Sequence, residues 1–96
     1  MIQKNRYNIG MYNHQEIDTL KIERAILQIS NIVKEVAVFM HHGHLFALIY
    51  PNFHEAKKRK LIRLENEIRW YAVELYNIKA PEEQKIKGYR LSLIHI

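Results

Sequence analysis

The 96-residue chain contains no cysteine, only three glycines and only two prolines. The lack of cysteine excludes a disulfide scaffold and any metal site built on thiolates, and it fits a reducing compartment. No apolar run approaches the roughly 20 residues that a transmembrane helix needs, and the start of the sequence has no signal-peptide pattern. We therefore expect one small globular domain that works in the cytoplasm.

Apolar and basic residues are abundant instead. Apolar residues make up 48% of the chain, which is enough for a core, and the formal net charge is +5. An excess of positive charge suits nucleic acid, an anionic membrane surface or an anionic ligand such as a nucleotide or CoA. Much of the excess lies in residues 57–60, followed by Arg63, and such a run on a helix is usually a solvated face.

Glycine, proline and turn residues divide the sequence into a short series of elements. Asp18 is the expected N-cap of the first helix, and His42 with Gly43 the expected turn between two paired strands. The pattern predicts an N-terminal hairpin (7–12 and 15–17), a helix (19–29), two paired strands (34–41 and 44–50), a long helix (54–76) and a last strand (85–90).

The expected fold class is therefore α+β. An N-terminal β-hairpin is followed by the order α-β-β-α-β, which should form a small, mainly antiparallel sheet with two helices packed on it. The same order also fits the split βαβ, ferredoxin-like arrangement, and the order of elements alone does not choose between the two.

The spacing of apolar residues predicts which face of each helix is buried. The first helix should bury Ile22, Ala25, Ile26 and Ile29. The second should bury Leu61, Leu64, Ile68, Tyr71 and Leu75. Aromatic residues on the second helix belong either to the core or to an interface with another domain: Trp70, Tyr71 and Tyr76.

Four stretches, in order along nearly the whole chain, together carry a family pattern. Residues 17–23 (IDTLKIE) are similar to an "I-D/N-P-x-E-I-E" helix start after a hairpin, and residues 32–38 (IVKEVAV) to a "V-x-E-V-A-V-V" strand. Residues 45–52 (LFALIYPN) resemble an "x-L-x-A-L-I-x-P" strand, and residues 80–87 (APEEQKIK) an "L-P-x-Y-x-K-I" segment. The chain thereby resembles the C-terminal lid domain of AMP-forming acyl-CoA synthetases, most of all the bacterial long-chain fatty-acid ligases.

This resemblance implies a role in a two-step ligase of fatty acid metabolism. A carboxylate attacks ATP to give an acyl-adenylate, and the thiol of CoA then displaces AMP. ATP with Mg and CoA would serve the intact parent enzyme, and the fragment alone would hold no cofactor. The partner would be the N-terminal adenylation domain of the same parent chain, with fatty acyl-adenylate and CoA as substrates and no nucleic acid. The resemblance allows peripheral membrane association of the parent.

In that family the lid rotates between two orientations, one for each half-reaction. The resemblance divides the chain into a hinge or linker region (1–6), an incomplete lid (7–90) and a terminal segment (91–96). It places the hinge at Arg6 or Tyr7. It assigns the turn that faces CoA to Asn13, His14, Gln15 and Glu16. The family usually has glycine where this chain has His14, and an imidazole there would obstruct the approach of pantetheine.

The lysine that the family uses for adenylation lies in a "P-K-T-x-x-G-K" loop, which this sequence lacks. The last six residues, LSLIHI, match one reading frame of a common sequencing adapter, so we interpret 91–96 as a non-native tail. The alternative is a genuine apolar strand. The resemblance therefore assigns no catalytic residue to the fragment, and we expect it to be inactive alone.

Three histidines surround Gly43: His41, His42 and His44. Such a cluster could ligate zinc or nickel. Neighbouring residues in a strand point to opposite faces, however, so His41 and His42 should diverge unless the turn rotates one of them. We expect a polar turn and no metal site.

A small basic nucleic-acid-binding module is the competing function. The order βαββαβ occurs in RNA-recognition folds, which stack bases on aromatic strand residues. Residues 44–50 lack the motif of that fold, although Phe46 and Tyr50 could form a small platform. A further alternative is a free-standing, degenerate lid that acts as an interaction protein.

Overall fold

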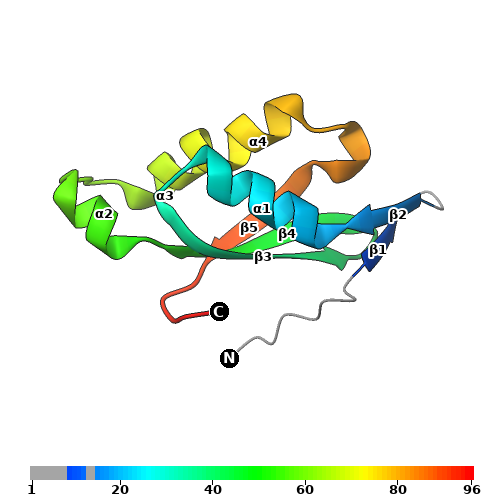
Figure 1. The fold of residues 1–96 in the computed structure, drawn as a ribbon, viewed down its shortest axis with the longest axis horizontal. Helices are drawn as coiled ribbons and strands as arrows, with labels where there is room; N and C mark the ends of the chain where they lie inside the picture. The colour runs from blue at the N-terminus through cyan, green and yellow to red at the C-terminus, as the bar shows by residue number, and fades with distance from the viewer. Residues whose placement is uncertain (1–8, 13–14) are drawn as a thin grey trace.

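The computed structural model describes residues 9–12 and 15–96 and shows an α+β fold, as the sequence predicts (Figure 1). Two strands come first, followed by a helix and a strand pair: β1 (Ile9–Tyr12), β2 (Gln15–Asp18), α1 (Thr19–Ile29), β3 (Val33–His41) and β4 (His44–Pro51). Five helical segments and a last strand complete the fold: α2 (Phe53–Lys58), α3 (Leu64–Ile68), η1 (Arg69–Val73), α4 (Glu74–Lys79), η2 (Glu82–Gln84) and β5 (Ile86–Leu91).

The strands form two sheets. β1 and β2 pair as an antiparallel hairpin, while the second sheet has the order β3-β4-β5. In that sheet β3 and β4 are antiparallel, whereas β4 and β5 are parallel and direct neighbours. A split βαβ unit would place another strand between the two parallel strands, so the second sheet does not have the ferredoxin-like arrangement.

Helices cover one face of the three-stranded sheet (Figure 1). Residues of β4 alternate between the two faces, with Leu45, Ala47 and Ile49 buried and the residues between them half-buried. A period of two is typical of a strand with one face on the core. The core joins these strand residues to helix residues, chiefly Ile22 and Ile26 of α1, Ile68 of α3, Ala72 and Val73 of η1, and Tyr76 of α4.

Helix α1 begins as the sequence predicts. Oδ1 of Asp18 accepts hydrogen bonds from the backbone N–H groups of Leu20 (3.1 Å) and Lys21 (3.2 Å), which satisfies donors that have no partner within the helix. Ile22 and Ile26 are buried as expected, but the side chain of Ile29 is exposed.

Glu23 of α1 is buried, although its side chain is a carboxylate. Its Oε2 accepts a hydrogen bond of 2.8 Å from the backbone N–H of Val38 in β3. Because β3 is an edge strand of its sheet, this bond ties the helix to the strand and satisfies a buried polar group.

The predicted turn at His42 and Gly43, between β3 and β4, is confirmed. His41 pairs with His44, and His42 and Gly43 between them have φ angles of 52° and 78°. Positive φ at both central residues is the signature of a type I′ turn, which suits the twist of an antiparallel hairpin.

The prediction of one helix over 54–76 is wrong. Helix α2 ends at Lys58, because the N–H of Lys60 bonds to the carbonyl of Lys57 and the N–H of Leu61 to that of Ala56. These two bonds, together with a φ of 57° at Lys60, form a Schellman motif. Glycine usually occupies the left-handed position of this motif. Because Lys60 occupies it here, the residue pattern gave no sign that α2 ends at Lys58.

The predicted buried stripe of the second helix is also wrong in its second half. Tyr71 and Leu75 are exposed, and the following residues, Ala72 and Tyr76, are buried instead. The segment η1 is a π-helical turn, in which the N–H of Glu74 bonds to the carbonyl of Arg69. Such a turn holds one extra residue, so it moves the buried face by one position.

Among residues 9–12 and 15–96, no helix has both the length and the apolar character needed to cross a membrane.

Candidate functional site

The predicted hinge and half of the predicted turn cannot be located, since Arg6, Tyr7, Asn13 and His14 lie outside the described residues. Gln15 and Glu16 lie on β2, where their backbones pair with Tyr12 and Met11. The hairpin formed by β1 and β2 lies at one end of the molecule, next to the start of α1 (Figure 1).

The motif residues that follow the hairpin hold it to the rest of the fold. Ile17 of β2 is fully buried in the core, Asp18 caps α1, and Glu23 bonds to β3. The motif of residues 17–23 therefore has a structural role: it joins the hairpin, the helix and the sheet.

The face of the sheet opposite the helices carries an apolar groove of about 650 Å³. Its walls come from all three strands, and the residues that matter most are Phe39, His41, Phe46, Gly88 and Arg90. Sequence reasoning named Phe46 but missed the groove, whose signal was the alternation of Phe46, Leu48 and Tyr50 with the buried residues of β4.

Phe46 is the centre of this groove. Its ring centroid lies 6.4 Å from that of Phe39 and 5.7 Å from that of His41. A Cβ atom at position 88 would lie 2.6 Å from the Phe46 ring, so only glycine allows the ring to lie over β5. Gly88 therefore shapes the groove.

In the histidine turn, the backbone rotates His42, which is the exception to strand alternation foreseen from the sequence. The ring centroids of His41 and His42 lie 4.1 Å apart, because the left-handed backbone at His42 belongs to the turn and no longer follows strand alternation. In the part of the chain that the structure describes, no group of three or more histidine, cysteine, aspartate or glutamate side chains is placed to hold a metal ion.

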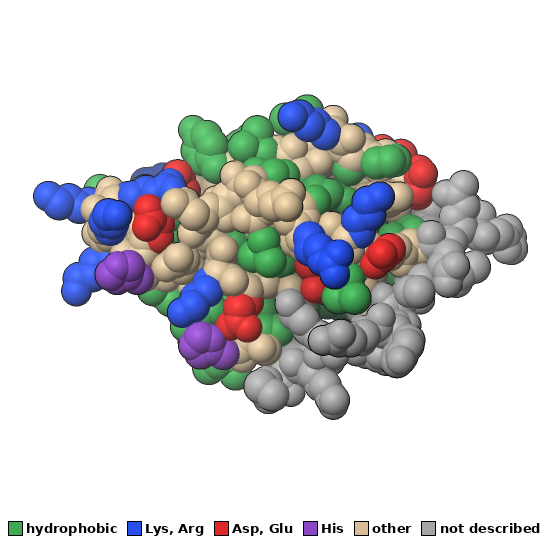
Figure 2. Space-filling view, viewed as in Figure 1, with side chains coloured by type: hydrophobic (Ala, Val, Ile, Leu, Met, Phe, Trp, Pro, Cys, Tyr) green, Lys and Arg blue, Asp and Glu red, His purple; other side chains and the backbone are tan. Residues whose placement is uncertain are grey.

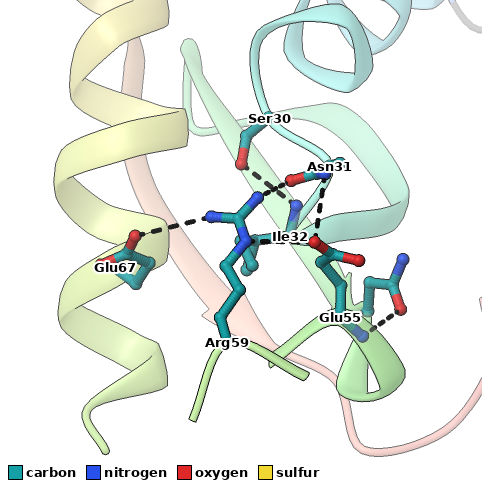
Figure 3. A network of polar contacts seen from close by, with 7 residues as sticks. Ser30, Asn31, Ile32, Glu55, Arg59 and Glu67 are labelled. Carbon is teal, nitrogen blue, oxygen red and sulfur yellow. Dashed lines mark hydrogen bonds and ion pairs between the residues drawn. The ribbon is translucent and has the colours of Figure 1, made fainter. Parts of the chain in front are cut away.

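The basic run at 57–60 divides into one structural residue and several exposed ones. Nε of Arg59 donates to Glu55 at 3.2 Å, and its guanidinium also contacts Asn31 and Glu67 (Figure 3). This network joins α2 to the α1–β3 connection and to α3. The other basic residues of the segment are exposed: Lys57, Lys58, Lys60 and Arg63.

Two groups with shifted pKa values lie where the last helix meets β5, and both shifts have structural causes. Burial raises the pKa of Tyr76 to about 12, and its hydroxyl donates a hydrogen bond of 2.7 Å to the carbonyl of Gln84. Hydrogen bonds from Lys87 and Lys85 lower the pKa of Glu82 on the surface.

The aromatic residues of the second helix separate into two groups. Tyr76 is in the core, whereas the side chains of Trp70 and Tyr71 are 56% and 57% exposed. They border a shallow groove of about 560 Å³ together with Lys60, Ile62 and Arg63.

Neither the comparison with protein-family models nor the search of curated proteins finds a match to this chain.

Proposed function

We propose that this chain is the C-terminal lid of an AMP-forming acyl-CoA synthetase of the long-chain fatty-acid type. The observation that carries the proposal is the placement of the β1–β2 hairpin. It stands at one end of a helix-backed three-stranded sheet and leads through buried Ile17 and the capping Asp18 directly into α1. Strands that are joined to the core in this way suit a segment that is presented to another domain's active site.

In this proposal the lid works by domain closure in a cytoplasmic parent enzyme. Rotation about a hinge near Arg6 and Tyr7 brings the turn at 13–16 against the acyl-adenylate when CoA attacks. The hairpin excludes water and guides pantetheine, and the parent's adenylation domain binds ATP with Mg. The apolar groove around Phe46 is a candidate contact surface for that larger domain.

This chain lacks the loop that carries the family's adenylation lysine, so in the proposal it should support only thioester formation. The test is to mix the chain with a long-chain adenylation domain from which the native lid has been deleted. Preformed fatty acyl-adenylate and CoA are supplied, and acyl-CoA is measured by chromatography. The rate should rise with the concentration of the chain and then saturate.

The matched control is the first half-reaction, measured as exchange of pyrophosphate into ATP. The chain should not accelerate this exchange, because it does not supply the family's adenylation lysine. The proposal is wrong if the isolated chain turns over ATP, or if thioester formation is unchanged at every concentration of the chain.

One observation favours the nucleic-acid alternative. The open sheet face carries Phe39 and Phe46 with Arg90 beside them, and aromatic residues on an open sheet can stack with bases. Titration with single-stranded RNA at increasing salt separates the two functions. Salt-sensitive binding that is lost in Phe46→Ala supports the alternative, whereas association with a separate adenylation domain supports the lid.

A further inference from the structure

The segment between α2 and α3 has an unusual surface. We call residues 57–63 the basic loop. This loop also holds a highly exposed apolar side chain, since Ile62 is 95% exposed. Lys60 precedes Ile62 and Arg63 follows it, and both are exposed. Isolated exposed apolar residues are common, but here Trp70 and Tyr71 lie beside Ile62 around one shallow groove.

The backbone explains why Ile62 points outward. The Schellman motif ends α2 at Lys58 and turns Leu61 inward, where it packs against the core. The contacts of Arg59 with Glu55 and Glu67 hold the loop between α2 and α3 (Figure 3). The contacts of Arg59 therefore hold the backbone segment that exposes Ile62.

All the charged residues of the basic loop itself are lysine or arginine. No ion pair is found within residues 9–12 and 15–96 for the exposed cations of the loop: Lys57, Lys58, Lys60 and Arg63. Two of the acids that flank the loop, Glu55 and Glu67, contact Arg59. A third flanking acid, Glu65, is exposed. Figure 2 shows basic side chains gathered at the end of the molecule that carries α2.

We propose that the basic loop docks this protein on an anionic lipid bilayer. Lysine and arginine side chains bind anionic headgroups, while Ile62 and the Trp70 indole enter the boundary between headgroups and acyl chains. A nucleic acid backbone would also attract the lysines, but it offers no apolar partner for Ile62. The inference does not rest on the proposed lid function, since it uses neither the hairpin nor the groove around Phe46.

The loop lies at the end of the molecule opposite the β1–β2 hairpin (Figure 1). Docking through the basic loop therefore leaves the hairpin accessible. A membrane-bound chain could still engage a partner domain at its other end.

The sequence contains a single tryptophan, and Trp70 borders the groove beside Ile62. Its fluorescence is a direct probe of insertion in the unmodified protein. The chain is mixed with vesicles of phosphatidylcholine alone, or of equal parts phosphatidylcholine and phosphatidylglycerol, with or without brominated acyl chains. Binding is measured by flotation. The mixed vesicles should bind the protein, and the brominated ones should quench Trp70.

Matched variants separate the loop from general positive charge. Replacing Lys57, Lys58 and Lys60 with glutamine should weaken binding to anionic vesicles by on the order of 100-fold, at about five-fold for each lysine. The control triple variant carries the same charge change elsewhere: Lys21→Gln, Lys34→Gln and Lys79→Gln. It should weaken binding much less.

A second pair tests the apolar tip. Ile62→Asp should reduce binding by about ten-fold or more, because a charged residue cannot enter the interface. Ile78→Asp, at another exposed isoleucine, should have little effect.

Several outcomes would overturn the docking proposal. One is that the protein binds neutral and anionic vesicles equally well. Another is that Trp70 fluorescence is not quenched in protein that floats with brominated vesicles. A third is that the two triple lysine variants lose the same amount of binding. Tight, salt-sensitive binding of single-stranded RNA that survives Ile62→Asp, without binding to vesicles, would also overturn it. Thermal unfolding of each variant checks that these exposed substitutions leave the fold intact.

Discussion

The side-chain amide of Asn77 on α4 forms two hydrogen bonds with the backbone of Ile86, the first residue of β5. Its Nδ2 donates to the Ile86 carbonyl at 2.9 Å, and its Oδ1 accepts from the Ile86 N–H at 2.8 Å. Ile86 is buried and begins the strand that runs parallel to β4. One side chain thus fixes where the last strand starts.

We expect Asn77→Ala to lower the free energy of unfolding by about 2–3 kcal/mol, because it leaves both backbone groups of Ile86 without this partner. For a domain of this size that is a fall in melting temperature of about 8–24 °C. Asn66→Ala, at an exposed residue of α3, is the control and should change stability by less than about 0.5 kcal/mol. Urea unfolding measures both. Equal effects of the two substitutions would show that the hydrogen bonds between Asn77 and Ile86 do not stabilise the fold.

Lys60 adopts the left-handed backbone that favours glycine. Lys60→Gly should therefore raise the free energy of unfolding by about 0.5–1 kcal/mol, since it removes the contact strain of Cβ at positive φ. The same substitution inside α2, Lys57→Gly, should lower it by about 0.5–1 kcal/mol. Opposite signs in chemical denaturation confirm the Schellman motif, and a loss of stability in both variants contradicts it.

Tyr76 should make the protein sensitive to alkaline pH. Its pKa is raised from 10.0 to about 12, so the folded state keeps the proton that the unfolded state loses. The resulting stability is fully present below pH 10 and is lost as the pH rises through 12. Between these values the stability advantage of the native protein over Tyr76→Phe should shrink, by at most about 1.4 kcal/mol per pH unit.

The control for this pH dependence is Tyr71→Phe, which alters an exposed phenol. Its stability should follow that of the native protein at every pH. A native protein and a Tyr76→Phe variant that lose stability in parallel from pH 10 to 12 would show that Tyr76 ionises normally.

The lid proposal makes a specific prediction for His14. His14→Gly should increase the rate of thioester formation with a lid-deleted adenylation domain by about ten-fold or more, because glycine leaves space for pantetheine where small misplacements are costly. His44→Gly, on the far hairpin, should leave the rate unchanged. If His14→Gly is no faster, the turn does not meet CoA in the proposed way.

Local turn chemistry could be predicted from the sequence because a few residues determine it. Asp18 has the acceptor that an N-cap needs, and His42-Gly43 has the right length and a glycine for a tight hairpin. The paired strands β3 and β4 followed from their apolar, β-branched composition. These features need no knowledge of what packs against them.

The second helix could not be predicted in the same way. Lysine at the left-handed position gave no signal of a helix end, because side-chain type only biases that conformation. The buried residues Ile68, Ala72, Val73 and Tyr76 have spacings of 4, 1 and 3, which differ from the i, i+3, i+4, i+7 pattern that sequence reasoning looks for. The π turn at Arg69–Val73 accommodates one extra residue, so tertiary packing determines which helix residues after Ile68 are buried.

The candidate site was only partly accessible to sequence reasoning. The turn at 13–16 came from a resemblance, and only the backbones of Gln15 and Glu16 lie within the described residues. The open groove depends on Phe46 meeting Gly88, two residues 42 positions apart whose contact follows from β4 and β5 being parallel neighbours. The exposure of Ile62 likewise depends on the unforeseen end of α2.

The π turn at 69–73 implies that this part of the chain is tolerant of a change in length. With one residue removed between Ile68 and Ala72, the buried positions would be spaced i, i+3, i+4 and i+7, the pattern of an ordinary α-helix. A deletion there would leave the same side chains against the sheet and would not shift the register of β5. Homologous chains that are one residue shorter at this point should therefore keep the same core, with a straight helix in place of the bulge.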